Sequence, residues 1–376
     1  MTFQLKPRDF HPPIPLTNVA LILPYTCLLE SMGAPVERLL ARSGIPVGLL
    51  QHPAAAVPLQ NAFRFGELAC RTQGTEYLGL HVGLANSLDD YGSYGQILKR
   101  SLTIHEYLRK GIALYNTLIT GQRCWLSEHG KVLRFNVATV GEPGLGSYQS
   151  HLETLVVTIA TLRGAAGRDW SPAEISLAYK SREPPPEIDL FTGSRISRGT
   201  GETYFTIPRT MMQRRFTAVN SGIPTTNRGS PAVHPLPEDM GGLVQLQIEA
   251  LLSDRTLHVD TVAESLAMSR RGLQRSLAEQ GLTYSQLLTD IRVRKAAVWL
   301  ENTDKTIAEI AFELGYRDAS NFTRAFRRQT GVPPQAFRGN ARKTWRPMLW
   351  ESIQRGIVLN RCTWHQMTGK LPSIRP

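Results

Sequence analysis

The stretch GYRDASNFTRAFRRQTGVPPQAFR, residues 315–338, decides how the C-terminal part of the chain folds. Phe322 and Phe326 stand four residues apart, so a helix places them on one face and leaves Arg324 on another. Gly331 ends this helix, because glycine adopts the left-handed conformation of a helix end at the lowest cost, and the Val-Pro-Pro that follows makes a rigid exit. A short arginine-rich helix with an aromatic inner face suits a groove of DNA, although an ordinary surface helix shares the pattern.

A repeat in the sequence separates these two interpretations. Four apolar residues at helical spacing occur twice, 48 residues apart: Val259, Val262, Ala263 and Leu266, then Ile307, Ile310, Ala311 and Leu314. A tight turn and a second helix follow each set, and Leu273 and Leu277 of the first copy correspond to Phe322 and Phe326 of the second. Two copies of helix, tight turn and helix predict a tandem helix-turn-helix arrangement.

A single helix is expected between the two copies. The segment YSQLLTDIRVRKAAVWLEN, residues 284–302, has an apolar stripe and no internal breaker. A connecting helix of roughly 17 residues, at about 1.5 Å per residue, is a rod of roughly 25 Å, suited to holding two reading helices in successive major-groove segments about 34 Å apart. The C-terminal part is therefore predicted to be all-α, with two helix-turn-helix motifs joined by a connecting helix.

The N-terminal part is predicted to be an α+β domain. Helical periodicity dominates its first half, and alternating patterns follow at residues 123–129, 131–139, 173–180 and 202–208. A long apolar helix at residues 147–167 lies among these strands. We therefore expect helices first and then a four-stranded mixed sheet with one long helix among its strands.

Composition marks the domain boundaries. Residues 220–239 are rich in Pro, Gly, Ser, Thr and Asn and lack apolar periodicity, which is typical of a linker. This places a first domain at residues 1–219 and the helix-turn-helix domain at residues 240–339; the resemblance described below implies an effector-binding or dimerisation role for the first and a DNA-binding role for the second. The basic tail of residues 340–376, with Trp345, Trp350 and Trp364, is expected to be a poorly structured extension, the alternative being added DNA contacts.

Charge and cysteine usage limit the classes of protein. The net charge of +12 is shared between the N-terminal part and the tail, so it is weak evidence for nucleic acid by itself. No apolar run is long enough to span a membrane and no signal peptide is evident, which favours the cytoplasm. The four cysteines lie far apart with no histidine at ligand spacing, so we expect reduced thiols, no metal site and no cofactor.

Enzyme motifs are also missing from the sequence. The glycine-rich GEPGLGS, residues 141–147, lacks the Gly-Lys-Ser/Thr of a phosphate loop. His81, His105, His129 and His151 have no catalytic partner at a telling spacing, and we interpret them as structural. We therefore expect no enzymatic activity.

The C-terminal region resembles the AraC/XylS family of bacterial transcription regulators. The resemblance is carried by VDTVAESLAMSRRGLQRSLAEQG (259–281), IRVRKAAVWL (291–300) and TIAEIAFELGYRDASNFTRAFRRQTGVPPQAFR (306–338). Three N-terminal stretches, at residues 92–116, 167–179 and 204–216, resemble the effector domain of one large subgroup, an α+β module. The tail resembles no family.

The resemblance implies double-stranded promoter DNA as the partner and assigns roles by position. Base contacts are expected from Arg271, Gln274, Arg275, Ser320, Asn321 and Arg324, and phosphate contacts from Ser269, Arg270, Thr323, Arg327, Arg328 and Arg338. Arg bonds guanine at two atoms, and Gln or Asn does so with adenine. Candidates for an effector pocket are Tyr91, Tyr94, Arg100, Tyr107 and Trp125, for each of which core or interface packing is the alternative.

These observations predict a sequence-specific, ligand-responsive activator. Its partners would be a small-molecule effector, RNA polymerase and a second copy of the chain in a homodimer. The alternatives are a ligand-independent repressor with the same fold and a nonspecific architectural DNA-binding protein. The ligand, the operator and the sign of regulation do not follow from the sequence.

Overall fold

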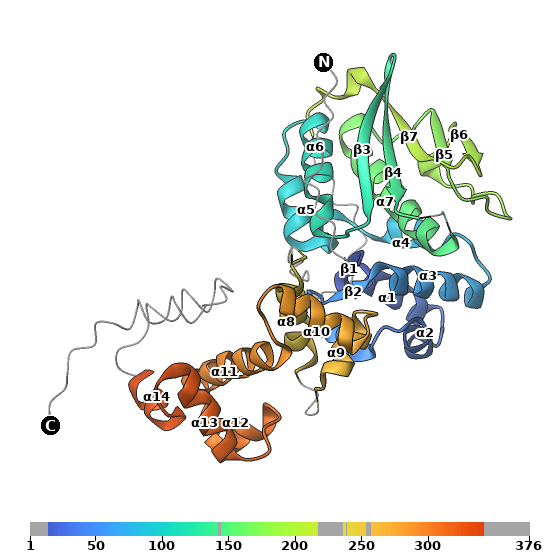
Figure 1. Cartoon of the computed structure of the whole chain (residues 1–376). Coiled ribbons are helices and arrows are strands. Elements are labelled where there is room, and N and C mark those ends of the chain that lie inside the picture. The colour runs from blue at the N-terminus through green and yellow to red at the C-terminus, as the bar shows by residue number, and fades with distance from the viewer. Residues whose placement is uncertain (1–13, 142–143, 217–235, 238, 253–256, 342–376) are drawn as a thin grey trace. The chain divides into compact units, whose positions relative to one another are not determined.

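The computed structural model describes residues 14–141, 144–216, 236–237, 239–252 and 257–341 (Figure 1). Contacts divide the chain into two compact units, residues 1–251 with 258–282 and residues 252–257 with 283–376. The first unit holds the N-terminal part and the first helix-turn-helix, and the second unit holds the connecting helix and the second helix-turn-helix. Most of the predicted linker and all of the tail beyond residue 341 lie outside the described residues, and the domain boundaries stay a prediction.

Helices dominate residues 19–114, as the periodicity predicts. The α-helices are α1 (Leu23–Ser31), α2 (Val36–Ser43), α3 (Leu59–Gln73), α4 (Leu78–Ala85), α5 (Gly92–Lys99) and α6 (Ile104–Leu114), with 3-10 turns η1 (Val19–Leu21), η2 (Val47–Gln51), η3 (Leu88–Tyr91) and η4 (Tyr115–Thr117). Two strands of three residues, β1 (Leu16–Asn18) and β2 (Ala56–Pro58), pair antiparallel among them. Such short strands carry no alternation, which is why the sequence does not predict them.

The mixed sheet has five strands where the sequence predicts four. Its order is β3 (Gln122–His129), β4 (Val132–Thr139), β7 (Thr203–Pro208), β5 (Glu174–Leu177) and β6 (Arg195–Arg198) (Figure 1). Neighbours are antiparallel except β5 and β6, which are parallel. The edge strand β6 was missed because its sequence, RISR, has charged ends and no buried face. The 3-10 turns η5 (Asp189–Phe191) and η6 (Arg209–Met211) complete this part.

The long helix α7 (Leu145–Ala166) is the centre of the N-terminal core. Leu152, Leu155 and Ile159 are fully buried between the sheet and the preceding helices. α4 approaches α7 so closely that a Cβ atom on Gly79 would stand 2.0 Å from the carbonyl oxygen of Gln149. Only glycine therefore permits this helix crossing.

The first helix-turn-helix follows α8 (Met240–Leu251) and consists of α9 (Val259–Ser265) and α10 (Arg270–Glu279). Between them the amide of Met268 donates to the carbonyl of Ala263, at 2.8 Å. Within the same unit, the buried Gln247 of α8 donates through Nε2 to the carbonyl of Ala56 on β2, at 2.7 Å, and to Ser265 Oγ of α9, at 3.3 Å. One side chain thus joins the first helix-turn-helix to a strand of the N-terminal part.

The second helix-turn-helix repeats a backbone hydrogen bond and a left-handed turn residue of the first. The second unit contains α11 (Tyr284–Asn302), α12 (Ile307–Glu313), α13 (Ala319–Thr330) and α14 (Pro334–Ala341). The amide of Tyr316 donates to the carbonyl of Ala311 at 2.9 Å, each 48 residues after its counterpart in the first turn. The turn residue is left-handed in both copies, at Ala267 (φ 51°) and Gly315 (φ 72°). The fold class inferred from the repeat is confirmed.

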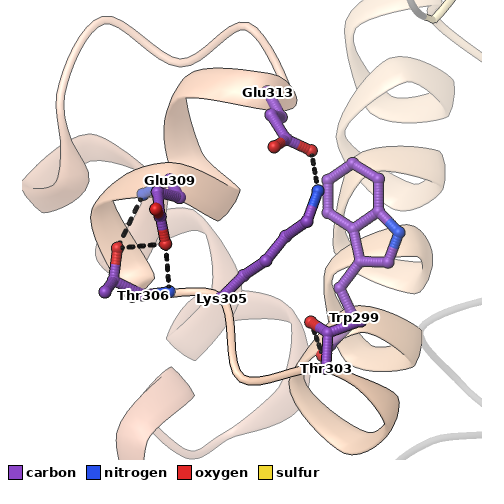
Figure 2. Close-up of polar contacts among 6 residues, drawn as sticks. All are labelled: Trp299, Thr303, Lys305, Thr306, Glu309 and Glu313. Atoms are coloured by element: carbon purple, nitrogen blue, oxygen red, sulfur yellow. Dashed lines mark hydrogen bonds and ion pairs between the residues drawn. The ribbon is translucent and has the colours of Figure 1, made fainter.

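Polar contacts fix the corner between α11 and α12 (Figure 2). Thr306 and Glu309 form a capping box: the Thr306 hydroxyl accepts from the Glu309 amide at 3.2 Å, and the Glu309 carboxylate accepts from the Thr306 amide at 2.7 Å. Beside it, Lys305 Nζ pairs with Glu313 at 2.5 Å and stands 4.6 Å from the ring centre of Trp299. The start of the second helix-turn-helix is therefore anchored to the connecting helix.

Candidate nucleic-acid interface and effector cavity

Helix α10 presents the predicted base-contacting residues of the first copy to solvent. Ser269 caps the helix by accepting from the amide of Gly272, at 3.1 Å. Leu273 and Leu277 are fully buried and hold the helix against its unit. Arg271, Gln274 and Arg275 are all exposed. The structure thus brings these three residues onto the accessible side of one helix.

Helix α13 presents a linked set of polar side chains. Asp318 caps the helix by accepting from the amide of Asn321, at 2.7 Å, and its second oxygen accepts from Asn321 Nδ2, also at 2.7 Å. Asn321 Oδ1 in turn accepts from Arg324 Nη2, at 2.5 Å. Ser320 and Arg324 are exposed and Asn321 is half-buried. The helix cap therefore positions Asn321 and, through it, Arg324.

The buried side of α13 is aromatic. Phe322 and Phe326 are fully buried, with ring centres 5.7 Å apart, and Phe326 contacts Phe337 of α14 edge to face at 5.3 Å. Tyr316 of the turn lies 5.4 Å from Phe322, beneath the guanidinium of Arg292. This cluster fixes the roll of α13, because two buried rings one turn apart determine which face points outward.

The predicted phosphate-contacting residues fall into two groups. Arg327 and Arg328 are exposed at the C-terminal end of α13, and Thr323 is half-buried on it. The other three have partners within the protein: Ser269 is the cap of α10, Arg270 pairs with Asp260 at 3.5 Å, and Arg338 donates to the carbonyl of Lys305. A phosphate would have to share or replace these partners.

A cavity of about 120 Å³ lies in the N-terminal part, lined mainly by residues of α1, α3, η3, α5, α6, η4 and α7. Its wall is mostly apolar and includes Leu21, Phe63, Leu98 and Ile119. Three of the predicted effector-site residues, Tyr91, Tyr94 and Tyr107, line it. The cavity therefore brings together residues of three different elements, η3, α5 and α6.

The other two predicted effector residues lie elsewhere. Arg100 is exposed after the end of α5, and Trp125 is half-buried on β3, beneath the guanidinium of Arg123 at 4.8 Å. Neither belongs to the cavity wall. Both are candidates because they are polar or aromatic residues. For Trp125 the reason for the difference is the strand, which places alternate side chains on opposite faces.

Glu153 of α7 lines the cavity and is not among the predicted effector-site residues. Its carboxyl accepts from Tyr25 at 2.8 Å, from Tyr91 at 2.9 Å and from Asn86 at 3.3 Å. Burial raises the pKa of Glu153 to about 7, even though these three hydrogen bonds act to lower it. The available signal was an acidic residue within the apolar run HLETLVVTIATL of the long helix.

The histidines that we interpret as structural include one with clear partners. His151 is buried on α7, and its ring nitrogens lie 2.7 Å from Thr139 Oγ1 and 3.2 Å from Thr203 Oγ1. Burial lowers the pKa of His151 to about 4.

Within the described ranges, no three His, Cys, Asp or Glu side chains are grouped as metal ligands. No helix in the described part of the chain is long and apolar enough to cross a bilayer.

Comparisons with known proteins match both parts of the chain. A model of the arabinose-binding domain of the AraC transcription regulator, N-terminal, matches residues 33–216, and a model of a helix-turn-helix domain matches residues 262–340. The second match spans most of the tandem repeat, and the first contains most of the cavity wall.

Relatives of similar length exist in two bacteria. The HTH-type transcriptional regulator VqsM of Pseudomonas aeruginosa is 25% identical over 273 residues, which are 70% of this chain and 83% of VqsM. The HTH-type transcriptional regulator VirS of Mycobacterium tuberculosis is 24% identical over 337 residues, 84% of this chain and 94% of VirS. Among solved structures, the transcriptional regulator CdpR of Pseudomonas aeruginosa is 20% identical with a TM-score of 0.36, covering 85% of this chain and 98% of CdpR.

Proposed function

Because the chain belongs to the AraC family of DNA-binding transcriptional regulators, we propose that it is a ligand-responsive activator that reads two successive major-groove segments with α10 and α13. The observation that carries this proposal is the hydrogen-bonded pair of Asn321 and the exposed Arg324, aligned by the cap of α13. Arg324 offers two donors to a guanine edge, and its counterpart Arg275 lies 49 residues earlier in the repeat.

The two helices offer different chemistry at matching positions. An offset of 49 residues places Arg271 against Ser320 and Gly272 against Asn321. Since glycine has no side chain to read a base, only the second helix can bond adenine through an amide at that position. We therefore expect an asymmetric operator, in which the two half-sites differ in sequence.

The contact between α8 and β2 supports a response to a ligand. Leu59 lines the cavity and directly follows β2, whose Ala56 accepts the hydrogen bond from Gln247. A ligand that moves the cavity wall therefore acts on a strand that touches the DNA-binding half. The ligand shifts the protein between two states only if it binds them with unequal affinity. As family expectations, a homodimer and contact with RNA polymerase in the cytoplasm belong to the same proposal.

The test is a footprint of the full-length protein on the DNA upstream of its own gene and on a genomic fragment library. The wild type is expected to protect about 17–20 base pairs per monomer, two major-groove segments in width. Arg275→Ala and Arg324→Ala should each weaken specific binding by roughly 1–3 kcal/mol and relax the base preference at one position. Adding the ligand should change occupancy or transcription.

Two control variants distinguish base-specific contacts from general electrostatic attraction to DNA. Arg328→Ala removes a cation at the end of α13 and should weaken binding evenly across sequences, with a shallower salt dependence. Arg38→Ala removes an exposed cation of α2 and should leave binding unchanged. Protection without a preferred site, with all recognition-helix variants behaving like Arg328→Ala, would favour the nonspecific architectural protein instead.

A further inference from the structure

The cavity combines an aromatic wall, one carboxyl group and no basic group. Five tyrosines line it: Tyr25, Tyr91, Tyr94, Tyr107 and Tyr115. Glu153 is the single acidic residue among the described residues of the wall, and no lysine, arginine or histidine occurs among them. A carboxylate or phosphate ligand would therefore enter a site with a like charge and no counter-ion.

The tyrosine hydroxyls are already bonded within the protein. Tyr25 and Tyr91 donate to Glu153, Tyr94 donates to the carbonyl of Gly111 at 3.1 Å, and Tyr115 lies 3.1 Å from Thr154 Oγ1. What these side chains offer a ligand is chiefly their rings. Aromatic ring faces attract cations, and cages of them bind ammonium groups.

Glu153 has room for one more donor. A carboxylate accepts about four hydrogen bonds, and three are made by Tyr25, Tyr91 and Asn86. All three donors are neutral, so a carboxylate here is a buried negative charge without a positive partner. A cation placed beside it supplies that partner, and a charge-assisted bond is stronger than a neutral one.

We infer that the cavity recognises a small hydrophobic ammonium ion, whose cationic nitrogen bonds Glu153 and whose apolar body fills the tyrosine-lined wall. This inference rests on the proposed ligand response and names the chemical class of its effector. The volume of about 120 Å³ limits the apolar body to roughly a single ring, because an apolar cavity of about 150 Å³ holds benzene.

The test measures binding of three ligands of one shape and different charge to the full-length protein by calorimetry. Benzylammonium is the cation, benzyl alcohol the neutral match and benzoate the anion. Benzylammonium should bind at least tenfold more tightly than benzyl alcohol, and benzoate should not bind. Glu153→Gln should lower benzylammonium affinity at least tenfold and leave benzyl alcohol affinity within about twofold, which also shows that the cavity of the variant is intact.

Proton exchange gives a second readout that needs no variant. The titratable groups facing the Glu153 carboxyl are the phenols of Tyr25 on α1, Tyr91 on η3 and Tyr115 on η4, and burial raises the pKa of each well above its usual value. They stay neutral between pH 6 and 8, so Glu153 is the group that ionises. Benzylammonium binding at pH 6.5 should therefore release a proton, seen as heats that depend on the buffer, and affinity should rise with pH through about 7.

Equal affinity for benzyl alcohol and benzylammonium, or binding without proton release, would overturn the inference. These failures are separate from failure of the proposed function. A protein that protects a specific DNA site but shows no preference for the cation remains a regulator with a different effector. A protein that prefers the cation but protects no specific site supports the cavity assignment and contradicts the DNA-reading proposal.

Discussion

Asn321 and Arg324, one helical turn apart on α13, are joined by a hydrogen bond of 2.5 Å from the guanidinium Nη2 to the amide Oδ1. Because the same amide also donates to Asp318, its nitrogen and its oxygen are both engaged. Asn321 must release at least one of these partners to bond an adenine edge. The bond therefore couples the two side chains in the free protein, and we propose that they read DNA together rather than independently.

A double-mutant cycle tests this coupling. Asn321→Ala and Arg324→Ala should each cost roughly 1–3 kcal/mol of operator binding, and the double variant should cost less than the sum by about 0.5 kcal/mol or more. Arg275→Ala combined with Arg324→Ala is the matched control, since these arginines lie on different helices, and the two losses should add. Additivity in both pairs would mean that the bond has no part in reading DNA.

The two turns of the repeat give a paired stability prediction. Ala267 adopts φ 51°, which costs an L-residue about 1–2 kcal/mol, whereas its counterpart Gly315 adopts φ 72° without that strain. Ala267→Gly removes this strain and should stabilise the first helix-turn-helix. The gain is limited to about 1 kcal/mol, because glycine loses more chain entropy on folding than alanine does. Gly315→Ala should destabilise the second by a similar amount.

Amide hydrogen exchange measures both effects locally. Slower exchange over residues 259–279 in Ala267→Gly and faster exchange over residues 307–330 in Gly315→Ala are expected, each without change in the other copy. Faster exchange in Ala267→Gly would show that entropy of the unfolded turn outweighs the strain.

The sequence predicts the C-terminal part better than the N-terminal part for a physical reason. The same pattern of apolar residues occurs twice, so each copy supports the interpretation of the other. α11 covers the segment in which the connecting helix is predicted. The four strands predicted from alternating sequence patterns are all present. β1 and β2 were not predicted because three residues are too short to show a pattern, and β6 was not predicted because it has charged ends and no buried face.

The cavity was only partly predictable for the same reason. Tyr91, Tyr94 and Tyr107 are aromatic residues within one stretch of sequence, and they do line it. Glu153 and Tyr25 are 128 residues apart, and only the packing of α1 against the α4–α7 pair brings the phenol to the carboxyl. The exposure of Arg100 likewise depends on tertiary structure, and so does the face of the predicted strand on which Trp125 lies.

Gly79 should be essential to the packing of α4 on α7. Gly79→Ala places a Cβ atom 2.0 Å from the Gln149 carbonyl oxygen, a backbone atom that can move only with the helix. The expected loss is roughly 3 kcal/mol of unfolding free energy, measured by urea denaturation of the N-terminal signal. Gly48→Ala is the control, since a Cβ atom there meets nothing within 4 Å, and it should change stability by less than about 0.5 kcal/mol.

Gln247 should transmit the state of the cavity to the first helix-turn-helix. Gln247→Leu keeps the size of the side chain but removes the bonds to Ala56 and Ser265. We expect ligand affinity in the absence of DNA to be unchanged, while the factor by which ligand alters operator affinity falls toward one. Fluorescence anisotropy of labelled operator, with and without ligand, gives that factor. An unaltered factor would exclude this bond as the route.

Glu153 should make the stability of the protein fall as pH rises. Its folded pKa of about 7 lies above the ordinary value of 4.5, so between these pH values the unfolded chain ionises while the folded protein keeps its proton. The free energy of unfolding should drop by about 3 kcal/mol over that window and level off above pH 7, at about 1.36 kcal/mol per unit of pKa. Urea titrations at several pH values measure the drop.

His151 changes the free energy of unfolding in the opposite direction over much of the same pH range. Its folded pKa of about 4 lies below the ordinary 6.5, so the unfolded chain binds the proton first and stability rises as pH rises from 4 to 6.5. The two effects partly cancel in the wild type, and the total profile alone cannot separate them. The difference in unfolding free energy between wild type and Glu153→Gln isolates the effect of the carboxyl. The variant should become more stable relative to wild type as pH rises from 4.5 to 7, and the difference should stay constant above pH 7. A difference that does not vary with pH would place the pKa of Glu153 near its ordinary value.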